Sequence, residues 1–101
     1  MIVVNTTFHV ESSIEQEWVA WIHATYLAIA LSSGVHCRPL FLKIMSQMEG
    51  GAGYAVQVHA DSESDADRWL NVVQPKLLAE MHGRWGEKAL FFTTLMQEVK
   101  A

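Results

Sequence analysis

Apolar and polar side chains alternate along four segments of the chain, as is typical of β-strands that bury one face. The alternations run from Ile2 to Val10, from Leu40 to Met45, from Tyr54 to Ala60 and from Leu90 to Met96. A glycine-rich run, Glu49 to Gly53, separates the second alternation from the third. We therefore expect these two strands to form a β-hairpin.

A helical repeat of apolar residues fills the segment between the first and second strands. It runs from Ile14 to Ile29, and Gly34 follows as a candidate cap at its end. Ser12 stands three residues before Glu15, which is the spacing of a capping box. The sequence therefore predicts a first helix of about five turns.

A second helical repeat lies between the third and fourth strands. It runs from Ala66 to Trp85, after the acidic run Asp61 to Asp65, which offers a cap and a favourable charge at a helix start. Gly86 follows the repeat. Because the repeat passes through Pro75, we expect this helix to be kinked or restarted near that residue.

The order of elements is β-α-β-β-α-β over residues 1–101, with no linker or low-complexity tract between them. Right-handed crossovers would fold this order into a four-stranded antiparallel sheet with both helices on one face. The predicted fold is therefore a single α+β domain with the ferredoxin-like arrangement.

The face of the sheet without helices is predicted to be apolar in part. We expect the helices to cover a face that includes Leu40, Leu42, Leu90 and Phe92. The opposite face would then carry Val3, Phe41, Met45, Phe91 and Leu95. Since soluble monomers rarely expose such a patch, these five residues are the predicted interface of a homodimer packed sheet to sheet, and a monomer is the alternative.

Composition and charge exclude several classes of partner. Half of the 101 residues are hydrophobic, 18% are charged, the formal net charge is −4, and the basic residues are scattered singly. No basic stripe is available for nucleic acid. The longest apolar stretch, Trp18 to Leu31, contains His23 and Thr25 and is too short to span a bilayer.

The single cysteine, Cys37, cannot form a disulfide within the chain, and the start Met1 to Val4 lacks a basic region. The expected location is therefore the cytoplasm. None of the five histidines stands three to five residues from another, so the sequence predicts no metal site and no cofactor.

Three helical residues are candidates for proton transfer if a cavity lies between helices and sheet: Tyr26, His23 and His82. Candidate ligand contacts are Trp18, Asn5, Gln57 and His59. Each has a purely structural alternative, because a tryptophan on an apolar helical arc usually belongs to the core and His23 lies off that arc.

Several short motifs together resemble one bacterial family of unknown function. They are the opening Met1 to Phe8, the Glu17-Trp18-x-x-Trp21 helix, Gly34, the Tyr54 to Gln57 strand, Pro75 to Leu77 with Glu80, and the Arg84 to Gly86 turn. The family is similar to the dimeric α+β barrels, which include small cofactor-free monooxygenases. The resemblance implies a dimer and assigns no reaction.

The resemblance also implies a departure at two positions. Many members of the family carry a histidine where this chain has Tyr26, and another where it has Met81. The absence of both weakens the case for a shared catalytic site. Three hypotheses stay open: a homodimer that binds a small apolar or aromatic ligand, a cofactor-independent monooxygenase or isomerase acting on an acidic aromatic substrate, and a subunit that docks another protein on its sheet.

Overall fold

The computed structural model describes residues 1–33, 37–46 and 48–100, with only the backbone at residue 37. The predicted cap at Gly34 and the histidine at 36 lie outside the described residues. The strands are β1 (Ile2–Glu11), β2 (Cys37–Lys43), β3 (Gly51–Ala60) and β4 (Ala89–Gln97). The first helical stretch joins η1 (Ser12–Ile14), α1 (Glu15–Trp21), η2 (Ile22–Tyr26) and α2 (Leu27–Ser32), and the second joins α3 (Glu63–Arg68), η3 (Trp69–Val73), α4 (Gln74–Trp85) and η4 (Gly86–Lys88).

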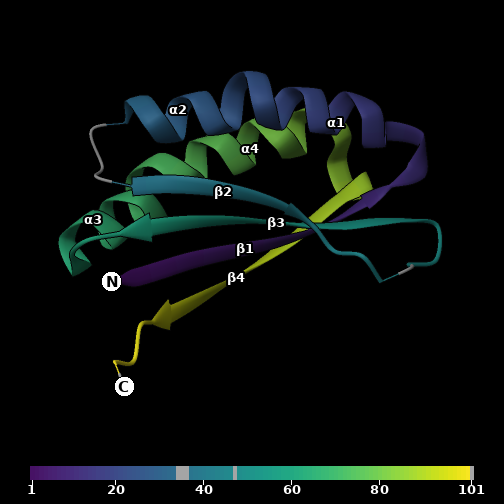
Figure 1. The fold of residues 1–101 in the computed structure, drawn as a ribbon. Coiled ribbons are helices and arrows are strands. Elements are labelled where there is room, and N and C mark those ends of the chain that lie inside the picture. The colour runs from purple at the N-terminus through teal and green to yellow at the C-terminus, as the bar shows by residue number, and fades with distance from the viewer. Residues whose placement is uncertain (34–36, 47, 101) are drawn as a thin grey trace.

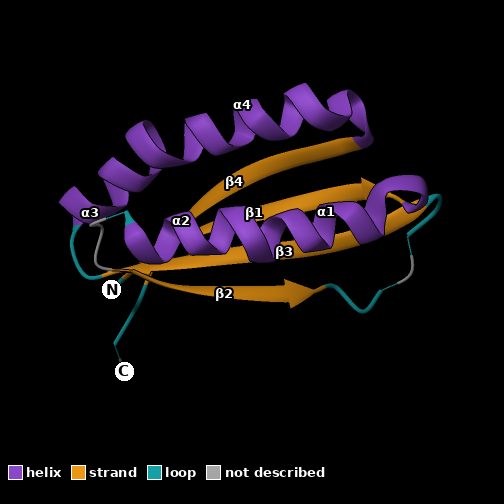
Figure 2. Cartoon of the chain, turned by 90° about the horizontal axis from the view of Figure 1, so that it is seen from above, coloured by secondary structure: helices purple, strands orange, loops and turns teal. Residues whose placement is uncertain are grey.

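The four strands form one antiparallel sheet in the order β2-β3-β1-β4. Both helical stretches lie on the same face of this sheet, as Figure 1 shows from the side and Figure 2 from above. The predicted ferredoxin-like arrangement is confirmed. We call the face without helices the open face.

The two helices begin in different ways. The Ser62 hydroxyl accepts a hydrogen bond of 3.1 Å from the Asp65 amide, so the predicted cap of the second helix is confirmed. The capping box predicted at Ser12 is wrong, because the chain enters there through a 3₁₀ turn without a side-chain cap. The Glu15 carboxylate accepts a hydrogen bond from the Tyr54 hydroxyl instead.

The second helical stretch restarts beside its proline, as predicted. The α-helix α4 begins at Gln74, so Pro75 lies in its first turn, where its missing N–H costs little, and α4 continues to Trp85. The irregularity precedes the proline, as the π-helical turn η3 from Trp69 to Val73. A matching π-helical turn, η2, interrupts the first helix from Ile22 to Tyr26, and nothing in the sequence pattern predicted it.

The strand register corrects the predicted faces of β2. Phe41 pairs with Val56, which is buried under the helices, and its ring stacks on the ring of Tyr54 with centroids 5.4 Å apart. Phe41 therefore lies on the helix side, and its predicted place on the open face is wrong. Leu40 and Leu42 take the open face in its place.

The same correction applies to β4. Phe91 pairs with Phe8 and Leu95 pairs with Val4, both of which are buried on the helix side. The predicted open-face positions of Phe91 and Leu95 are therefore wrong. In each edge strand, the residues on both faces are apolar, so the alternation of apolar and polar residues could not show which face is buried. A shift of one residue in the pairing moves every side chain to the opposite face.

The open face carries a different set of apolar residues from the predicted one. Val3 does lie on it, whereas Met45 follows the end of β2 and is 96% exposed. The large hydrophobic side chains exposed on the open face are Leu40, Leu42, Leu90, Phe92 and Met96. Whether this face meets a second copy of the chain stays a prediction.

The core lies between the helices and the helix side of the sheet. Its largest fully buried side chains include Trp18, Trp69, Tyr26 and Phe8, whose rings contact one another across the layers. In the part of the chain that the structure describes, no helix is long and apolar enough to cross a membrane.

Candidate functional site

The helix side of β4 is incompletely covered by the helices. Phe91 and Leu95 point to this side and yet are 46% and 56% exposed, and Thr93 between them is partly exposed. Figure 2 shows β4 running beside α4 rather than beneath it. We call the surface formed by Phe91, Thr93 and Leu95 the β4 flank.

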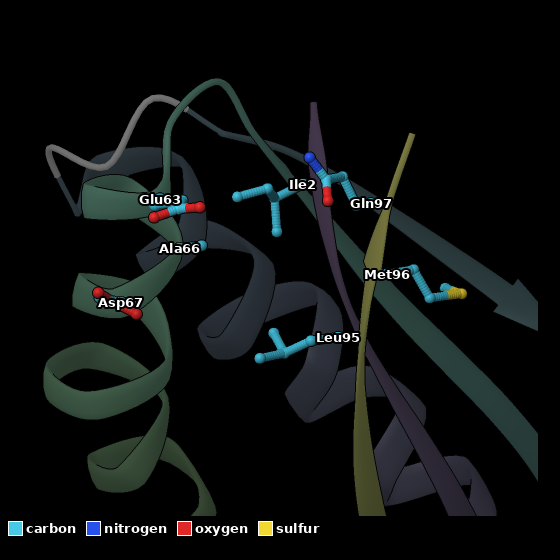
Figure 3. Close-up of a pocket in the computed structure, with 7 residues that line it drawn as sticks. All are labelled: Ile2, Glu63, Ala66, Asp67, Leu95, Met96 and Gln97. Atoms are coloured by element: carbon cyan, nitrogen blue, oxygen red, sulfur yellow. The ribbon is translucent and has the colours of Figure 1, made fainter. Parts of the chain in front are cut away.

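An open cavity of about 340 Å³ lies at one end of the β4 flank, between β4 and α3. In Figure 3, Ile2 and Leu95 point from the sheet toward α3, where Ala66 faces them, whereas Met96 points away. Two carboxylates of α3, Glu63 and Asp67, line the same space. We call it the flank cavity, and its volume falls in the range of small-molecule sites.

A chain of hydrogen bonds leads from the β4 flank into the core. The Thr93 hydroxyl lies 3.1 Å from the Thr6 hydroxyl, and the Gln74 amide nitrogen donates to Thr6 at 2.5 Å and to the Tyr26 hydroxyl at 3.1 Å. Thr6, Gln74 and Tyr26 are almost completely buried. We call these four residues the buried polar chain, and it connects a partly exposed hydroxyl to a buried phenol.

Two irregular helical turns meet at the inner end of the buried polar chain. Tyr26 is the last residue of η2, Trp69 is the first of η3, and Gln74 follows η3 directly. Single π-helical turns in proteins occur frequently at functional sites. Because both turns meet at Tyr26, this part of the core is a candidate functional site.

The indole N–H of Trp69 is buried and has no hydrogen-bond partner among the described residues. The Trp69 ring contacts the Tyr26 ring with centroids 5.7 Å apart. An unpaired buried donor normally costs stability, so it is a feature that packing alone does not explain.

Burial raises the pKa of Tyr26 to about 12, although the hydrogen bond from Gln74 acts in the opposite direction. The phenol therefore stays protonated over the whole neutral range. At this position Tyr26 can donate or relay a proton, but it cannot act as a base at neutral pH.

A second polar cluster lies at the other end of the sheet. Glu15 accepts a hydrogen bond of 2.6 Å from the Tyr54 hydroxyl and forms an ion pair of 3.5 Å with Lys43. The hydrogen bond from Tyr54 is the main cause of a lowered pKa at Glu15. This cluster joins the start of the first helix to the β2–β3 hairpin, and we assign it a structural role.

The structure does not bring the three proton-transfer candidates together. Tyr26 is buried, whereas His23 and His82 are exposed on the helices. The His23 ring contacts the ring of Phe41 at the β2 edge, with centroids 5.3 Å apart. Tyr26, His23 and His82 therefore do not lie together, and of these three candidates Tyr26 belongs to a polar network of the core.

The predicted ligand contacts are divided between the two faces of the sheet. Asn5 pairs with Gln57 on the open face, and the Gln57 side chain lies 3.3 Å from the His59 ring nitrogen. Trp18 is fully buried on the helix side, where its indole N–H donates to the sulfur of Met81 at 3.4 Å. Asn5, Gln57 and His59 therefore form one open-face cluster, from which Trp18 is separated by the sheet.

Other cavities lie between the helices and beside the β2–β3 hairpin. Tyr26, His23 and His82 line neither these nor the flank cavity. Among the described residues, no group of three or more histidine, cysteine, aspartate or glutamate side chains could hold a metal ion.

Sequence reasoning did not identify Thr6, Gln74 or Thr93. Two of them could have been identified, because each is a polar residue at a position where the repeat of the strand or helix places an apolar residue. Thr6 interrupts the buried alternation between Val4 and Phe8, and Gln74 stands four residues after Leu70 on the apolar arc. Buried polar groups need partners, so such positions predict a network even when its members are far apart in sequence.

The fold and the layer arrangement define an α+β protein of the ferredoxin-like class. A family model described as a domain of unknown function (DUF4286) matches residues 1–99. The chain belongs to this family. No curated protein matches the sequence.

Solved structures show the same fold at low sequence identity. A protein named as a candidate antibiotic biosynthesis monooxygenase from Deinococcus radiodurans is 13% identical, with a TM-score of 0.75 over 100% of this chain and 95% of its own. One of the same description from Bacillus cereus is 16% identical, with a TM-score of 0.59 over 99% and 96%. A de novo designed protein, Foldit4, is 9% identical with a TM-score of 0.61 over 97% and 98%, so this fold by itself implies no reaction.

Proposed function

We propose that this protein is a homodimer that binds a small apolar or aromatic ligand on the β4 flank of each subunit. One observation supports this function above all. Phe91 and Leu95 form an apolar surface on the helix side that the helices leave exposed, and Thr93 between them ends the buried polar chain. Small-molecule sites are usually concave and apolar with a few placed polar groups, and the flank cavity beside Leu95 supplies the concave part.

The flank cavity accounts for the size of the ligand. Leu95, which lines the cavity, lies about 7 Å from Thr93, because the two residues are two positions apart on one strand. A ligand with one aromatic ring and a short substituent would therefore reach both. The Phe91 ring offers a further aromatic contact at the other end of the flank.

Binding of a simple aromatic probe tests this function. Titration with α-methylstyrene, followed by methyl NMR, should shift the Leu95 signal and leave the Leu31 signal in place. Leu95→Ala should weaken binding, and Leu31→Ala is the matched control, since Leu31 is 69% exposed on α2 and belongs neither to the β4 flank nor to the open face. Equal shifts at both leucines, or none at either, would contradict the proposal.

The homodimer is proposed from the open face. Five large apolar side chains, Leu40, Leu42, Leu90, Phe92 and Met96, are exposed around the polar Asn5, Gln57 and His59. A second copy would cover the apolar groups and pair the amides across a two-fold axis. The apolar patch and the ability of amides to pair with themselves favour a second copy over an unrelated partner.

Sedimentation of the whole protein tests the dimer. Phe92→Lys should convert the dimer to a monomer, and Leu31→Lys, at an exposed apolar position on α2, should leave it intact. A monomeric wild-type protein would disprove the homodimer. It would then favour the alternative in which the open face docks a different protein.

A cofactor-independent monooxygenase is the second candidate function. The protonated phenol of Tyr26, linked through the buried polar chain to the β4 flank, could donate a proton to a bound substrate, and solved structures of this fold are named as monooxygenases. With the acidic aromatic substrate 1-naphthol, one dioxygen would give 1,4-naphthoquinone and one water. Oxygen uptake that Tyr26→Phe abolishes would support an enzyme, and the absence of uptake would contradict this activity on 1-naphthol.

We also propose that the protein works in the cytoplasm. The support is the single cysteine, Cys37, which makes the fold independent of disulfides within the chain. Fractionation of cells that express the tagged protein tests this location.

A further inference from the structure

The buried polar chain has a direction, and the direction determines what the β4 flank presents to a ligand. We propose that Thr93 acts as a hydrogen-bond donor that selects ligands with a neutral acceptor, such as a carbonyl oxygen. This inference rests on the proposed binding function of the β4 flank and names the chemical class of its ligand.

The direction starts at Gln74. Its amide nitrogen contacts both the Thr6 hydroxyl and the Tyr26 hydroxyl, so each of its two hydrogens has an acceptor. Because Gln74 is almost completely buried, leaving either hydrogen unpaired would be costly. Both hydroxyl oxygens therefore accept from Gln74.

The hydroxyl of Thr6 must then place its own proton within the core. Thr6 is almost completely buried, and its hydroxyl forms hydrogen bonds with two of the described residues, Gln74 and Thr93. The amide nitrogen of Gln74 is a donor and cannot accept the Thr6 hydrogen. This hydrogen is therefore donated outward, to the Thr93 oxygen at 3.1 Å.

Thr93 is the last member of the buried polar chain and the one that is partly exposed. Because its oxygen accepts from Thr6, its hydrogen points away from the core and onto the β4 flank. In the opposite direction, with Thr93 donating inward, the buried Thr6 hydrogen would be left without an acceptor. The arrangement that satisfies the Thr6 hydrogen and both amide hydrogens of Gln74 presents a donor to the ligand.

The negative charge of the flank cavity favours a ligand whose acceptor group is neutral. Glu63 and Asp67 line the cavity, and neither forms an ion pair among the residues that the structure describes. A ligand that carries a carboxylate would bring a third negative charge to the cavity that these two line. A neutral oxygen meets the donor without this repulsion.

Two isosteric probes test the inference. Acetophenone and α-methylstyrene differ only in that a carbonyl oxygen replaces a methylene group. In the wild-type protein, acetophenone should bind about five- to tenfold more tightly, as expected for one net hydrogen bond. Benzoate should bind more weakly than acetophenone. Dissociation constants are measured from the Leu95 methyl shift.

Variants of β4 show whether the preference for acetophenone comes from the Thr93 hydroxyl or from a general change in the strand. Thr93→Val should remove the preference for acetophenone, and Thr93→Ser should keep it. Thr94→Val should leave the preference unchanged, because Thr94 is exposed on the opposite face of the same strand. If Thr93→Val unfolds the protein, the binding of the three probes to the wild type and to Thr93→Ser still shows whether the ligand site prefers a neutral acceptor.

The possible failures are distinguishable. Equal binding of acetophenone and α-methylstyrene would overturn the inference and leave the proposed ligand site standing. Benzoate binding as tightly as acetophenone would overturn the neutral acceptor. If no probe shifts the Leu95 signal, the binding function fails and this inference fails with it.

Discussion

The ring of Tyr26 meets the ring of Trp69 nearly edge-on, with centroids 5.7 Å apart and planes 69° apart. Each residue belongs to a π-helical turn, and the two turns lie on different helices. The contact therefore joins the two irregular parts of the helical layer at the inner end of the buried polar chain.

Removal of the Tyr26 hydroxyl tests the energetic importance of this chain. Tyr26→Phe keeps the ring and its contact with Trp69, but it leaves one buried hydrogen of Gln74 without an acceptor. We expect the free energy of unfolding to fall by about 1–3 kcal/mol. Urea denaturation measures it, and an unchanged midpoint would show that Gln74 finds another partner.

Substitution of Trp69 should change the free energy of unfolding less than substitution of Tyr26. Its indole N–H has no hydrogen-bond partner in the part of the chain that the structure describes, so Trp69→Phe removes an unsatisfied donor together with part of the ring. These effects oppose each other, and we expect a change within about 1 kcal/mol, smaller than that of Tyr26→Phe despite the larger loss of atoms. A larger loss would mean that the N–H has a partner, such as a buried water molecule.

Alkaline pH should destabilise the fold through its two tyrosines. Burial raises the pKa of Tyr26 from 10.0 to about 12, and burial followed by the hydrogen bond to Glu15 raises that of Tyr54 to about 12. A raised pKa in the folded state means that this stabilisation is complete below pH 10 and is lost as the pH rises toward 12. Urea midpoints across this interval should fall, and less steeply for Tyr26→Phe.

The order of elements could be predicted from the sequence because each strand and helix carries its own period. The faces of the two edge strands could not. The segment Leu40-Phe41-Leu42 is apolar at every position, as is Leu90-Phe91-Phe92, so only the pairing with β1 and β3 selects the buried side. The central strands, with Val4 and Val58 alternating with polar residues, were predicted on the correct faces.

The candidate site could be predicted only in part, for a related reason. Tyr26 was identified as a candidate because it is a polar aromatic residue on an apolar helix. Its partners come from β1, β4 and the second helix, and pairs so distant in sequence are fixed by packing rather than by spacing. The π-helical turns that place Tyr26 and Trp69 together have no local sequence signal.

Two serines at helix starts allow a direct comparison, because one side chain accepts a capping hydrogen bond and the other does not. Ser62→Ala should lower the free energy of unfolding by about 1 kcal/mol, because it removes the acceptor of the Asp65 amide. Ser12→Ala should change it by less than about 0.5 kcal/mol, since the structure shows no side-chain cap at that turn. Equal losses in thermal or urea unfolding would indicate a capping role at Ser12 that the structure does not show.

Two glycines should respond to alanine with opposite signs. At Gly51, an added Cβ would come within 2.2 Å of the Val10 backbone oxygen, so the first pair of β1 and β3 must separate. At Gly83, inside α4, nothing lies within 4 Å of an added Cβ. Gly51→Ala should therefore destabilise the protein by about 2–4 kcal/mol, whereas Gly83→Ala should stabilise it by about 0.5–1 kcal/mol through helix propensity. Urea unfolding of both variants checks this, and a stable Gly51→Ala protein would mean that the hairpin can shift away from β1 at little cost.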